Sequence, residues 1–239
     1  MELQRMPALF AGLEELSVPG WDAAALQQAT QAYPRPRAIV CVSPRWQTRG
    51  VCISIAPEQD SLHAMESVST RVARRVAGLL DMPSARLDSS HPLDPEVVQL
   101  VQALYPQADI PVVQISLDSE LSALEHAALA AWLRPLREQG VLIAGIGTIC
   151  PDADDATRQQ VSCFRDQVGQ LIDEGDIVRL AECRLPAPGG ERHMHLAQSA
   201  LPLLYALAVR EAGDSIEFFN GKCAGMPATP SVVLHPKAA

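Results

Sequence analysis

An alternation of apolar strands with amphipathic helices constrains this chain more than any other feature. Residues 110–117 and 141–146 are nearly continuous apolar runs, and residues 121–139 between them carry apolar side chains at helical spacing. Such runs are typical of strands buried on both faces of a parallel sheet, and a strand, a helix and a strand in this order form a right-handed crossover. The pattern predicts an α/β fold with a mainly parallel, twisted sheet that helices cover on both faces.

Weaker signals extend the alternation along the whole chain. A length of 239 residues fits one domain, which we expect to span residues 1–239. Asp94, Pro95 and Glu96 are typical of a helix start, with an N-cap, a proline in the first turn and a carboxylate at the positive end of the dipole. The other expected elements are strands at 37–42 and 50–55, helices at 21–33, 61–80, 95–104, 155–172 and 196–211, the last kinked at Pro202, and edge strands at 215–219 and 231–234.

Charge and composition exclude several classes of partner. The 19 Lys and Arg against 28 Asp and Glu give a net charge of −9, which disfavours binding to nucleic acid. The longest nearly apolar run, residues 196–209, is too short to cross a bilayer, and residues 1–5 offer no apolar signal core. The 6 cysteines form no C-x-x-C pair and are typical of free thiols. We therefore expect a cytoplasmic protein without a membrane partner.

Three local motifs allow a chemical interpretation, and for each a structural one is favoured. Gly145-Ile-Gly147 follows an apolar strand as a phosphate loop does, but it lacks the third glycine and no Gly-Lys-Ser/Thr follows. The acidic run at residues 152–155 precedes a helix and suits capping better than metal binding. His193 and His195 would share one face of a strand at a separation that a metal could bridge, but no third ligand is identifiable.

Five longer stretches occur in an order that resembles one known family. They are Met6-Pro-Ala-Leu-Phe10, Pro36-Arg-Ala-Ile-Val-Cys-Val-Ser-Pro-Arg-Trp46, Tyr105-Pro-Gln-Ala-Asp-Ile-Pro-Val-Val-Gln-Ile-Ser-Leu117, Leu133-Arg-Pro-Leu-Arg-Glu-Gln-Gly-Val-Leu-Ile143 and Leu201-Pro-Leu-Leu204. Together they resemble the class III (LigB-type) extradiol ring-cleavage dioxygenases, especially the branch that includes DOPA dioxygenase. His126 stands where that family has the histidine of an H-x-x-L-G helix. The resemblance covers most of the chain and implies a role in the metabolism of aromatic compounds.

The same resemblance implies a non-haem Fe(II) held by histidines and by a carboxylate or a further histidine, and another histidine that acts as acid or base. Other residues stand at those positions. Leucine and proline offer no lone pair to a metal, and a guanidinium places a permanent cation where Fe(II) would lie. The replacements are Leu13, Arg45, Pro95, Pro151 and Ser199, and only His126 is clearly retained.

Three interpretations remain open. The first is a catalytically silent homologue without a metal cofactor, which acts as a binding or partner subunit in a homodimer or in a heteromer with an active homologous subunit. The second is an active extradiol dioxygenase whose Fe(II) or Zn site has been displaced to His91, His126, His193 or His195. The third is a binder of a small anionic or aromatic ligand at Arg45. No catalytic residue or metal ligand is assigned, and the expected binding residues are Arg45, Trp46, His126, His193 and His195.

Two expectations concern where binding takes place. Arg45 should line a pocket at the carboxyl ends of the parallel strands, near Trp46 and His126, and pair with a carboxylate such as Glu14 or with one from a ligand. The two edge strands at 215–219 and 231–234 should leave an apolar edge that a partner covers. Its exposed side chains would be Ile216, Phe218, Phe219, Val232 and Val233.

Overall fold

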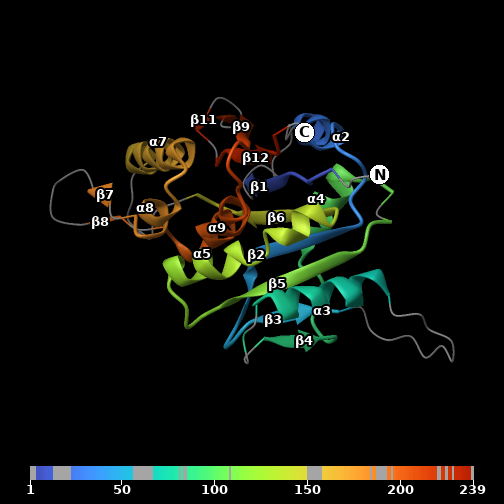
Figure 1. Cartoon of the computed structure of the whole chain (residues 1–239). Coiled ribbons are helices and arrows are strands. Elements are labelled where there is room, and N and C mark those ends of the chain that lie inside the picture. Colours follow the sequence, from blue (N-terminus) through green and yellow to red (C-terminus); the bar gives the residue numbers. More distant parts are fainter. Residues whose placement is uncertain are drawn as a thin grey trace, which may run out of the picture.

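An eight-stranded sheet crosses the molecule in the order β4-β3-β5-β2-β6-β1-β12-β9 (Figure 1). In this computed structural model, the described residues are 4–12, 23–55, 67–80, 82, 85–107, 109–149, 158–183, 185–186, 193–194, 196–219, 222–223, 226–227 and 229–237. The strands of the sheet are β1 (Ala8–Gly12), β2 (Ala38–Thr48), β3 (Cys52–Ser54), β4 (Arg86–Asp88), β5 (Val112–Asp118), β6 (Val141–Gly147), β9 (Ser215–Phe219) and β12 (Ser231–His235).

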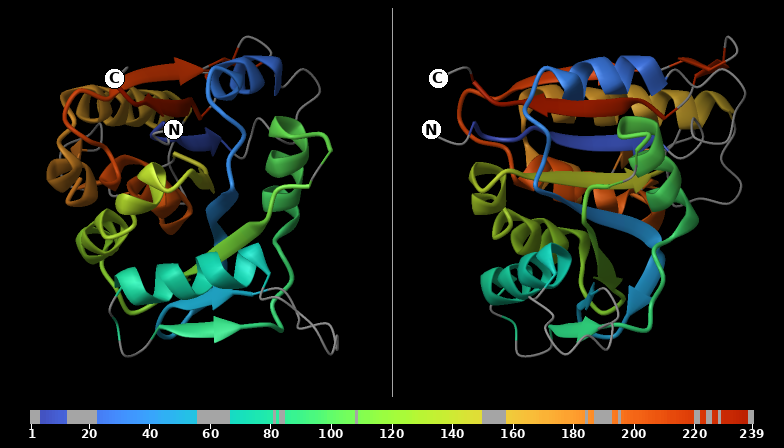
Figure 2. Two further views of the ribbon diagram at one scale, coloured as in Figure 1. Left: turned by 45° about the vertical axis from the view of Figure 1, so that its right-hand side comes forward. Right: turned by 90° about the vertical axis from the view of Figure 1, so that its right-hand side faces the viewer.

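Helices cover both faces of this sheet, as Figure 2 shows from two sides. Leu9 and Phe10 are adjacent in β1 and enter opposite cores, because successive side chains of a strand point to opposite faces. The helices are α2 (Ala23–Gln31), α3 (Val68–Leu80), α4 (Pro95–Leu104), α5 (Ala123–Ala131), α6 (Pro135–Glu138), α7 (Arg158–Glu174), α8 (Ile177–Ala181), the 3-10 helix η1 (Gln198–Ala200) and α9 (Leu201–Ala208). Residues of α3, α5, α7 and α9 belong to one core, and residues of α2 and α4 to the other.

The pairing of the strands confirms the α/β fold class. β1 with β6, β6 with β2, β2 with β5, and β3 with β4 are parallel pairs. β3 with β5, β1 with β12, and β12 with β9 are antiparallel. Two further pairs, β7 (Leu185–Pro186) with β8 (His193–Met194) and β10 (Lys222–Cys223) with β11 (Met226–Pro227), lie outside the main sheet.

Several expected elements have different bounds in the structure. The helix expected at 121–139 is divided into α5 and α6, and Pro135 begins the second helix because proline lacks the N–H that a continuous helix would need. Pro202 lies in the first turn of α9 and does not kink it. α7 extends to Glu174, and the short helix α8 and the strand β4 were not expected. The helices expected at 21–33 and 61–80 are described from Ala23 and Val68 onward.

The prediction that residues 231–234 form an edge strand is wrong. β12 pairs with β1 on one side and with β9 on the other, so it lies inside the sheet. Val232 and Val233 are buried as a result, and Phe218 is the only large apolar side chain of the expected patch that is more than a third exposed. The four cysteines whose side chains are described, Cys41, Cys52, Cys163 and Cys183, are free thiols. No helix among the described residues is long and apolar enough to span a bilayer.

Candidate functional site

The carboxyl ends of the parallel strands meet at one edge of the sheet. Gly12 of β1 lies opposite Gly147 of β6, and Gly145 lies opposite Val42 of β2. Ligand sites of α/β sheets form at this edge, so it is where the positions of the family ligands are expected. Arg45 follows Val42 in β2, and the amide of Thr148, just after β6, donates to the carbonyl of Ser199 at 3.0 Å.

Arg45 forms an ion pair with Glu96, from its Nε to the Oε1 of the carboxylate. The register of β2 against β5 shifts between Val42 and Gln47, and an irregularity of this kind re-aims the side chains within it. The Arg45 side chain is 63% exposed, whereas that of Glu96 is 8% exposed. The carboxylate that pairs with Arg45 is therefore Glu96 of α4; Glu14 lies outside the described residues.

Asp94 is the centre of a buried hydrogen-bond network below this ion pair. Its Oδ2 accepts from Ser43 Oγ and from Gln114 Nε2, both at 2.6 Å. Its backbone amide donates to Gln114 Oε1 at 3.0 Å, and the amide of Gln114 donates to Ser54 Oγ at 2.7 Å. Asp94 stands at the N-cap of α4 but makes no capping hydrogen bond with its side chain, so the expected cap is wrong in that respect. The network joins α4 to β2, β3 and β5 instead.

Trp46 stacks on His91 beside the same network. The ring centroids are 4.0 Å apart and the ring planes differ by 5°. His91 Nε2 lies 3.5 Å from Asp94 Oδ1, and it is buried without a hydrogen-bond partner among the described residues. Arg45, Trp46 and His91 thus share one region of the sheet edge.

His126 has a separate environment. Its Nε2 donates to the carbonyl of Asp118 at 3.1 Å, so its Nδ1 accepts from Tyr205 Oη at 2.9 Å. The residue is fully buried, and burial lowers the pKa of the imidazole while it raises the pKa of the Tyr205 hydroxyl. Both ring nitrogens are engaged, and the contacts of His126 connect α5 with β5 and α9. The structure does not bring it to Arg45 through any hydrogen bond or ion pair between the described residues.

The remaining predicted residues are only partly described. His193 lies in β8, but its side chain is not described. His195, Leu13 and Pro151 lie outside the described residues. The expected binding roles of His193 and His195 therefore stay predictions.

Fe(II), which the family resemblance implies, does not fit the described donors at this edge. The Arg45 cation occupies one ligand position, and Pro95 offers no lone pair at another. Glu96 is paired with Arg45, and Asp94 already accepts two hydrogen bonds. Within the described part of the chain, no three His, Cys, Asp or Glu side chains are grouped to hold a metal ion.

Gly145-Ile-Gly147 has a packing function in this structure. A Cβ on Gly145 would lie 2.1 Å from the carbonyl oxygen of Pro202, and one on Gly147 would lie 2.1 Å from that of Ser199. Only glycine allows η1 and the start of α9 to approach β6 this closely. This agrees with the structural interpretation of the motif.

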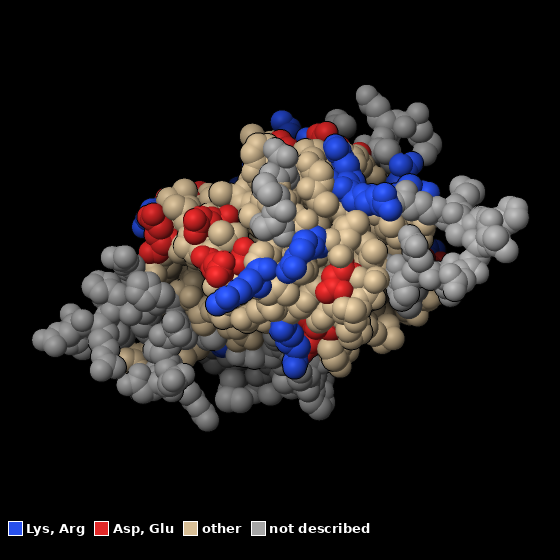
Figure 3. All heavy atoms as spheres, turned by 90° about the horizontal axis from the view of Figure 1, so that it is seen from below, with Lys and Arg blue, Asp and Glu red and all other residues tan. Residues whose placement is uncertain are grey.

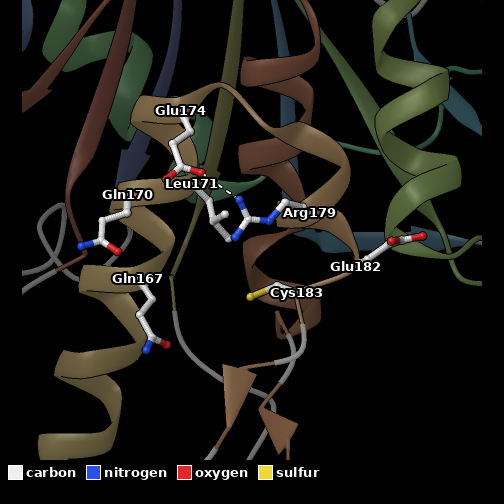
Figure 4. Close-up of a pocket in the computed structure, with 7 residues that line it drawn as sticks. All are labelled: Gln167, Gln170, Leu171, Glu174, Arg179, Glu182 and Cys183. Atoms are coloured by element: carbon white, nitrogen blue, oxygen red, sulfur yellow. Dashed lines mark hydrogen bonds and ion pairs between the residues drawn. The ribbon is translucent and has the colours of Figure 1, made fainter.

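A hollow lies between α7 and α8, away from the predicted residues (Figure 4). It encloses about 440 Å³, and Arg179 Nη1 crosses it to meet Glu174 Oε2 at 2.9 Å. Burial raises the pKa of the Cys183 thiol to about 11, so this cysteine is not an activated nucleophile. No motif in the sequence indicates this hollow. Its lining consists of Gln167, Gln170, Leu171, Glu174, Arg179, Glu182 and Cys183.

Comparisons with known proteins agree with the family resemblance. No protein-family model matches the chain. The chain is 27% identical to the 4,5-DOPA dioxygenase extradiol of Escherichia coli (strain K12) over 247 residues, which cover 90% of this chain and 89% of the relative. It is 23% identical to the protein of the same name from Beta vulgaris, over 80% of each chain, and 29% identical to that from Portulaca grandiflora, over 72% of each.

These relatives support an extradiol-dioxygenase-like family. A crystal structure of an uncharacterized protein from Escherichia coli K12 has the same fold, with a TM-score of 0.74 and 25% sequence identity. The alignment covers 96% of this chain and 99% of that one. The similarity therefore extends over nearly the full length of both chains.

Proposed function

We propose that this chain is a catalytically silent homologue of the extradiol ring-cleavage dioxygenases and acts as a binding or partner subunit. The observation that carries the proposal is the ion pair between Arg45 and Glu96 at the carboxyl edge of the sheet. Arg45 stands where the family resemblance places a ligand histidine. A guanidinium is permanently charged and cannot donate a lone pair, so it repels a divalent cation at this position.

The surroundings of Arg45 support the same proposal. Glu96 is almost fully buried, so a carboxylate that could otherwise have held a metal has the arginine as its counter-ion. Asp94, the other carboxylate on this stretch, has its Oδ2 held by Ser43 and Gln114. These polar groups now stabilise one another and leave no described donor set for iron.

Metal content and ring cleavage test the proposal directly. The purified chain is loaded with Fe(II) under anaerobic conditions, desalted, analysed for iron, and then assayed with a catechol for a yellow ring-opened product. The Escherichia coli relative is treated identically as a positive control. We expect less than stoichiometric iron and no product. Stoichiometric iron, or turnover within about a hundredfold of the relative, would overturn the proposal and favour the reading as an active extradiol dioxygenase.

A variant separates the contribution of Arg45 from that of the other replaced positions. In Arg45→His, the cation is replaced by the residue type that the family has at this position, and Glu96 is released from its partner. If Arg45 alone excludes iron, Arg45→His gains stoichiometric iron. We expect no such gain, because Pro95 and Ser199 also lack the lone pairs of histidine.

A further inference from the structure

The two margins of the sheet differ in length and in charge. β4 and β9 are the outermost strands, so each pairs with one neighbour only among the described residues. β4 has three residues, two of which, Arg86 and Asp88, are charged. Figure 3 views the molecule from the β4 side, and Lys, Arg, Asp and Glu side chains are interspersed over that face. Short strands and charged side chains keep further strands from adding to a sheet, so the β4 edge is protected.

β9, at the opposite margin, lacks this protection (Figure 2). It has five residues, Ser215–Phe219, and all five pair with β12 in one unbroken register. It contains no proline, lysine or arginine, and the pairing has no bulge. In an antiparallel strand, alternate residues direct both their N–H and their C=O to the same side. Within the part of the chain that is described, β9 therefore offers a row of backbone groups that matches another extended strand.

The side chains of β9 also suit a further strand. Glu217 is the only charged residue of β9, and its Oε2 accepts a hydrogen bond from His235 Nε2 at 2.9 Å. His235 belongs to β12, so this bond holds the carboxylate toward β12 and away from the open side. Nδ1 of the same imidazole accepts from Tyr33 Oη at 3.0 Å, which fixes the ring. Phe218, by contrast, is 37% exposed.

We propose that β9 pairs antiparallel with β9 of a second copy of this chain, so that the two sheets become one continuous sheet. A two-fold axis perpendicular to a sheet places an edge strand beside itself in the antiparallel direction, and antiparallel backbones are complementary whatever their sequence. Opposite residues point to the same face, so Phe218 of each copy meets Ile216 or Phe218 of the other. A second copy is favoured over a charged peptide, because His235 already engages the one charge of β9.

This pairing goes beyond the proposed function and does not depend on it. β9 is separated by β12, β1 and β6 from β2, which carries Arg45. Each copy has a net charge of −9, which opposes non-specific association, so specific contacts must hold the copies together. Oligomeric state and amide exchange test the dimer, and neither depends on iron or turnover. Failure of one proposal is therefore distinguishable from failure of the other.

A charge at Phe218 tests the pairing. The wild type, Phe218→Lys and Phe218→Glu are examined by light scattering and sedimentation at micromolar concentration. We expect the wild type to be a dimer. Each variant alone should have a dissociation constant raised at least about tenfold, because like charges then face each other across the axis. An equimolar mixture of the two variants should restore dimers, because lysine on one chain then faces glutamate on the other.

A matched control separates this contact from a general effect of charge. Val178→Lys adds a lysine at another exposed apolar residue, which is 49% exposed on α8, and should leave the dimer intact. Melting curves show whether each variant is folded. If the Phe218 variants do not fold, amide exchange of the wild type decides the question.

Amide hydrogen exchange of the wild type locates the contact without any substitution. Peptides that cover β9 should exchange more slowly in the dimer than after dilution to about a tenth of the dissociation constant, because the outward N–H groups are hydrogen-bonded only in the dimer. Peptides that cover β4 should exchange equally in both samples. A monomeric wild type, or a dimer in which dilution leaves the exchange of β9 unchanged, would overturn the proposal. Folded Phe218 variants that stay dimeric, or whose mixture stays monomeric, would do the same.

Discussion

Replacement of Asp214 by alanine should destabilise the fold more than any surface change, because it leaves a buried cation without its counter-ion. Arg137 and Asp214 have fully buried side chains, and Arg137 Nη1 lies 2.5 Å from Asp214 Oδ2. Arg137 also donates from Nη1 to the carbonyl of Val209 and from Nε to that of Met6, both at 2.8 Å. This side chain therefore joins α6 to the segment before β1 and to the turn that leads into β9.

The size of the effect follows from these contacts. Removal of one partner of a buried ion pair costs about 3–5 kcal/mol, since the remaining charge loses its counter-ion away from water. The amide of Glu211 also loses its acceptor on Asp214, which lies 3.0 Å away. For a chain of this length, each kcal/mol lowers the melting temperature by about 2–4 °C, so a decrease of roughly 6–20 °C is expected.

Thermal and urea unfolding, followed by circular dichroism, measure this loss against a matched control. Glu138→Ala removes the carboxylate that pairs with Arg5. The side chains of Glu138 and Arg5 are 63% and 30% exposed, so this substitution should lower the free energy of unfolding by no more than about 1 kcal/mol. Arg137→Met with Asp214→Ala should recover part of the stability lost in Asp214→Ala, because the unpaired charge is removed as well. An Asp214→Ala protein within about 1 kcal/mol of the wild type would refute the reasoning.

Three further outcomes follow from the described packing. Gly145→Ala should lower the melting temperature sharply, because the new Cβ would overlap the carbonyl of Pro202. Gly169→Ala should raise the stability by about 0.5–1 kcal/mol, because no neighbouring atom lies within 4 Å of the new Cβ. Equal effects of the two variants would contradict the close approach of α9 to β6. The pKa of His126 is lowered in the folded state, so the unfolded chain binds the proton more readily and the stability should fall as the pH drops below about 6.5. Urea unfolding from pH 8 to pH 5 should show that the free energy of unfolding depends less on pH in His126→Gln than in the wild type. The same pH dependence in both proteins would refute the assignment. Burial raises the pKa of Cys41 to about 12, so a thiol reagent at pH 8 should modify the exposed Cys163 in the native chain and Cys41 only after unfolding. Mass spectrometry of the labelled peptides measures which cysteine reacts first. Labelling of Cys41 before Cys163 in the native chain would contradict the prediction.

The central strands could be predicted from the sequence because their signals are local. The apolar runs expected at 110–117 and 141–146 are β5 (Val112–Asp118) and β6 (Val141–Gly147), and both lie inside the sheet, where both of their faces are buried. The position of β12 could not be predicted in the same way. An apolar run does not reveal whether a strand is paired on one side or on two, and its partner β1 is more than 200 residues away in the sequence. β4 could not be predicted, because its three residues, Arg86, Leu87 and Asp88, carry no apolar pattern.

The sequence predicts that Arg45 and Trp46 lie on a strand of the parallel sheet, but it does not predict the contacts of Arg45. The motif that ends in Arg45 and Trp46 lies within β2, which continues to Thr48, and the pairing of Arg45 with Glu96 depends on how α4 packs beside β2. The sequence Asp94-Pro95-Glu96 predicts a helix start, and the family resemblance places a ligand position at Pro95, but neither signal indicates that Glu96 pairs with Arg45. Both carboxylates have a second use, since Asp94 binds Ser43 and Gln114 while Glu96 neutralises Arg45. Helix-start signals describe the backbone and say nothing about which side chains another element brings to them.

The motifs that resemble the dioxygenases serve the fold wherever the structure describes them. Arg137, within the motif 133–143, anchors three carbonyl or carboxylate oxygens, and Gly145 and Gly147 admit the start of α9, which carries Leu201-Pro-Leu-Leu204. These residues are fixed by steric contact and by buried hydrogen bonds, and none of them needs a metal. The ligand positions have no such structural requirement, so Arg45 and Pro95 can stand there without disturbing the sheet. The architecture therefore does not depend on which residues stand at the ligand positions, because packing and catalysis depend on different residues.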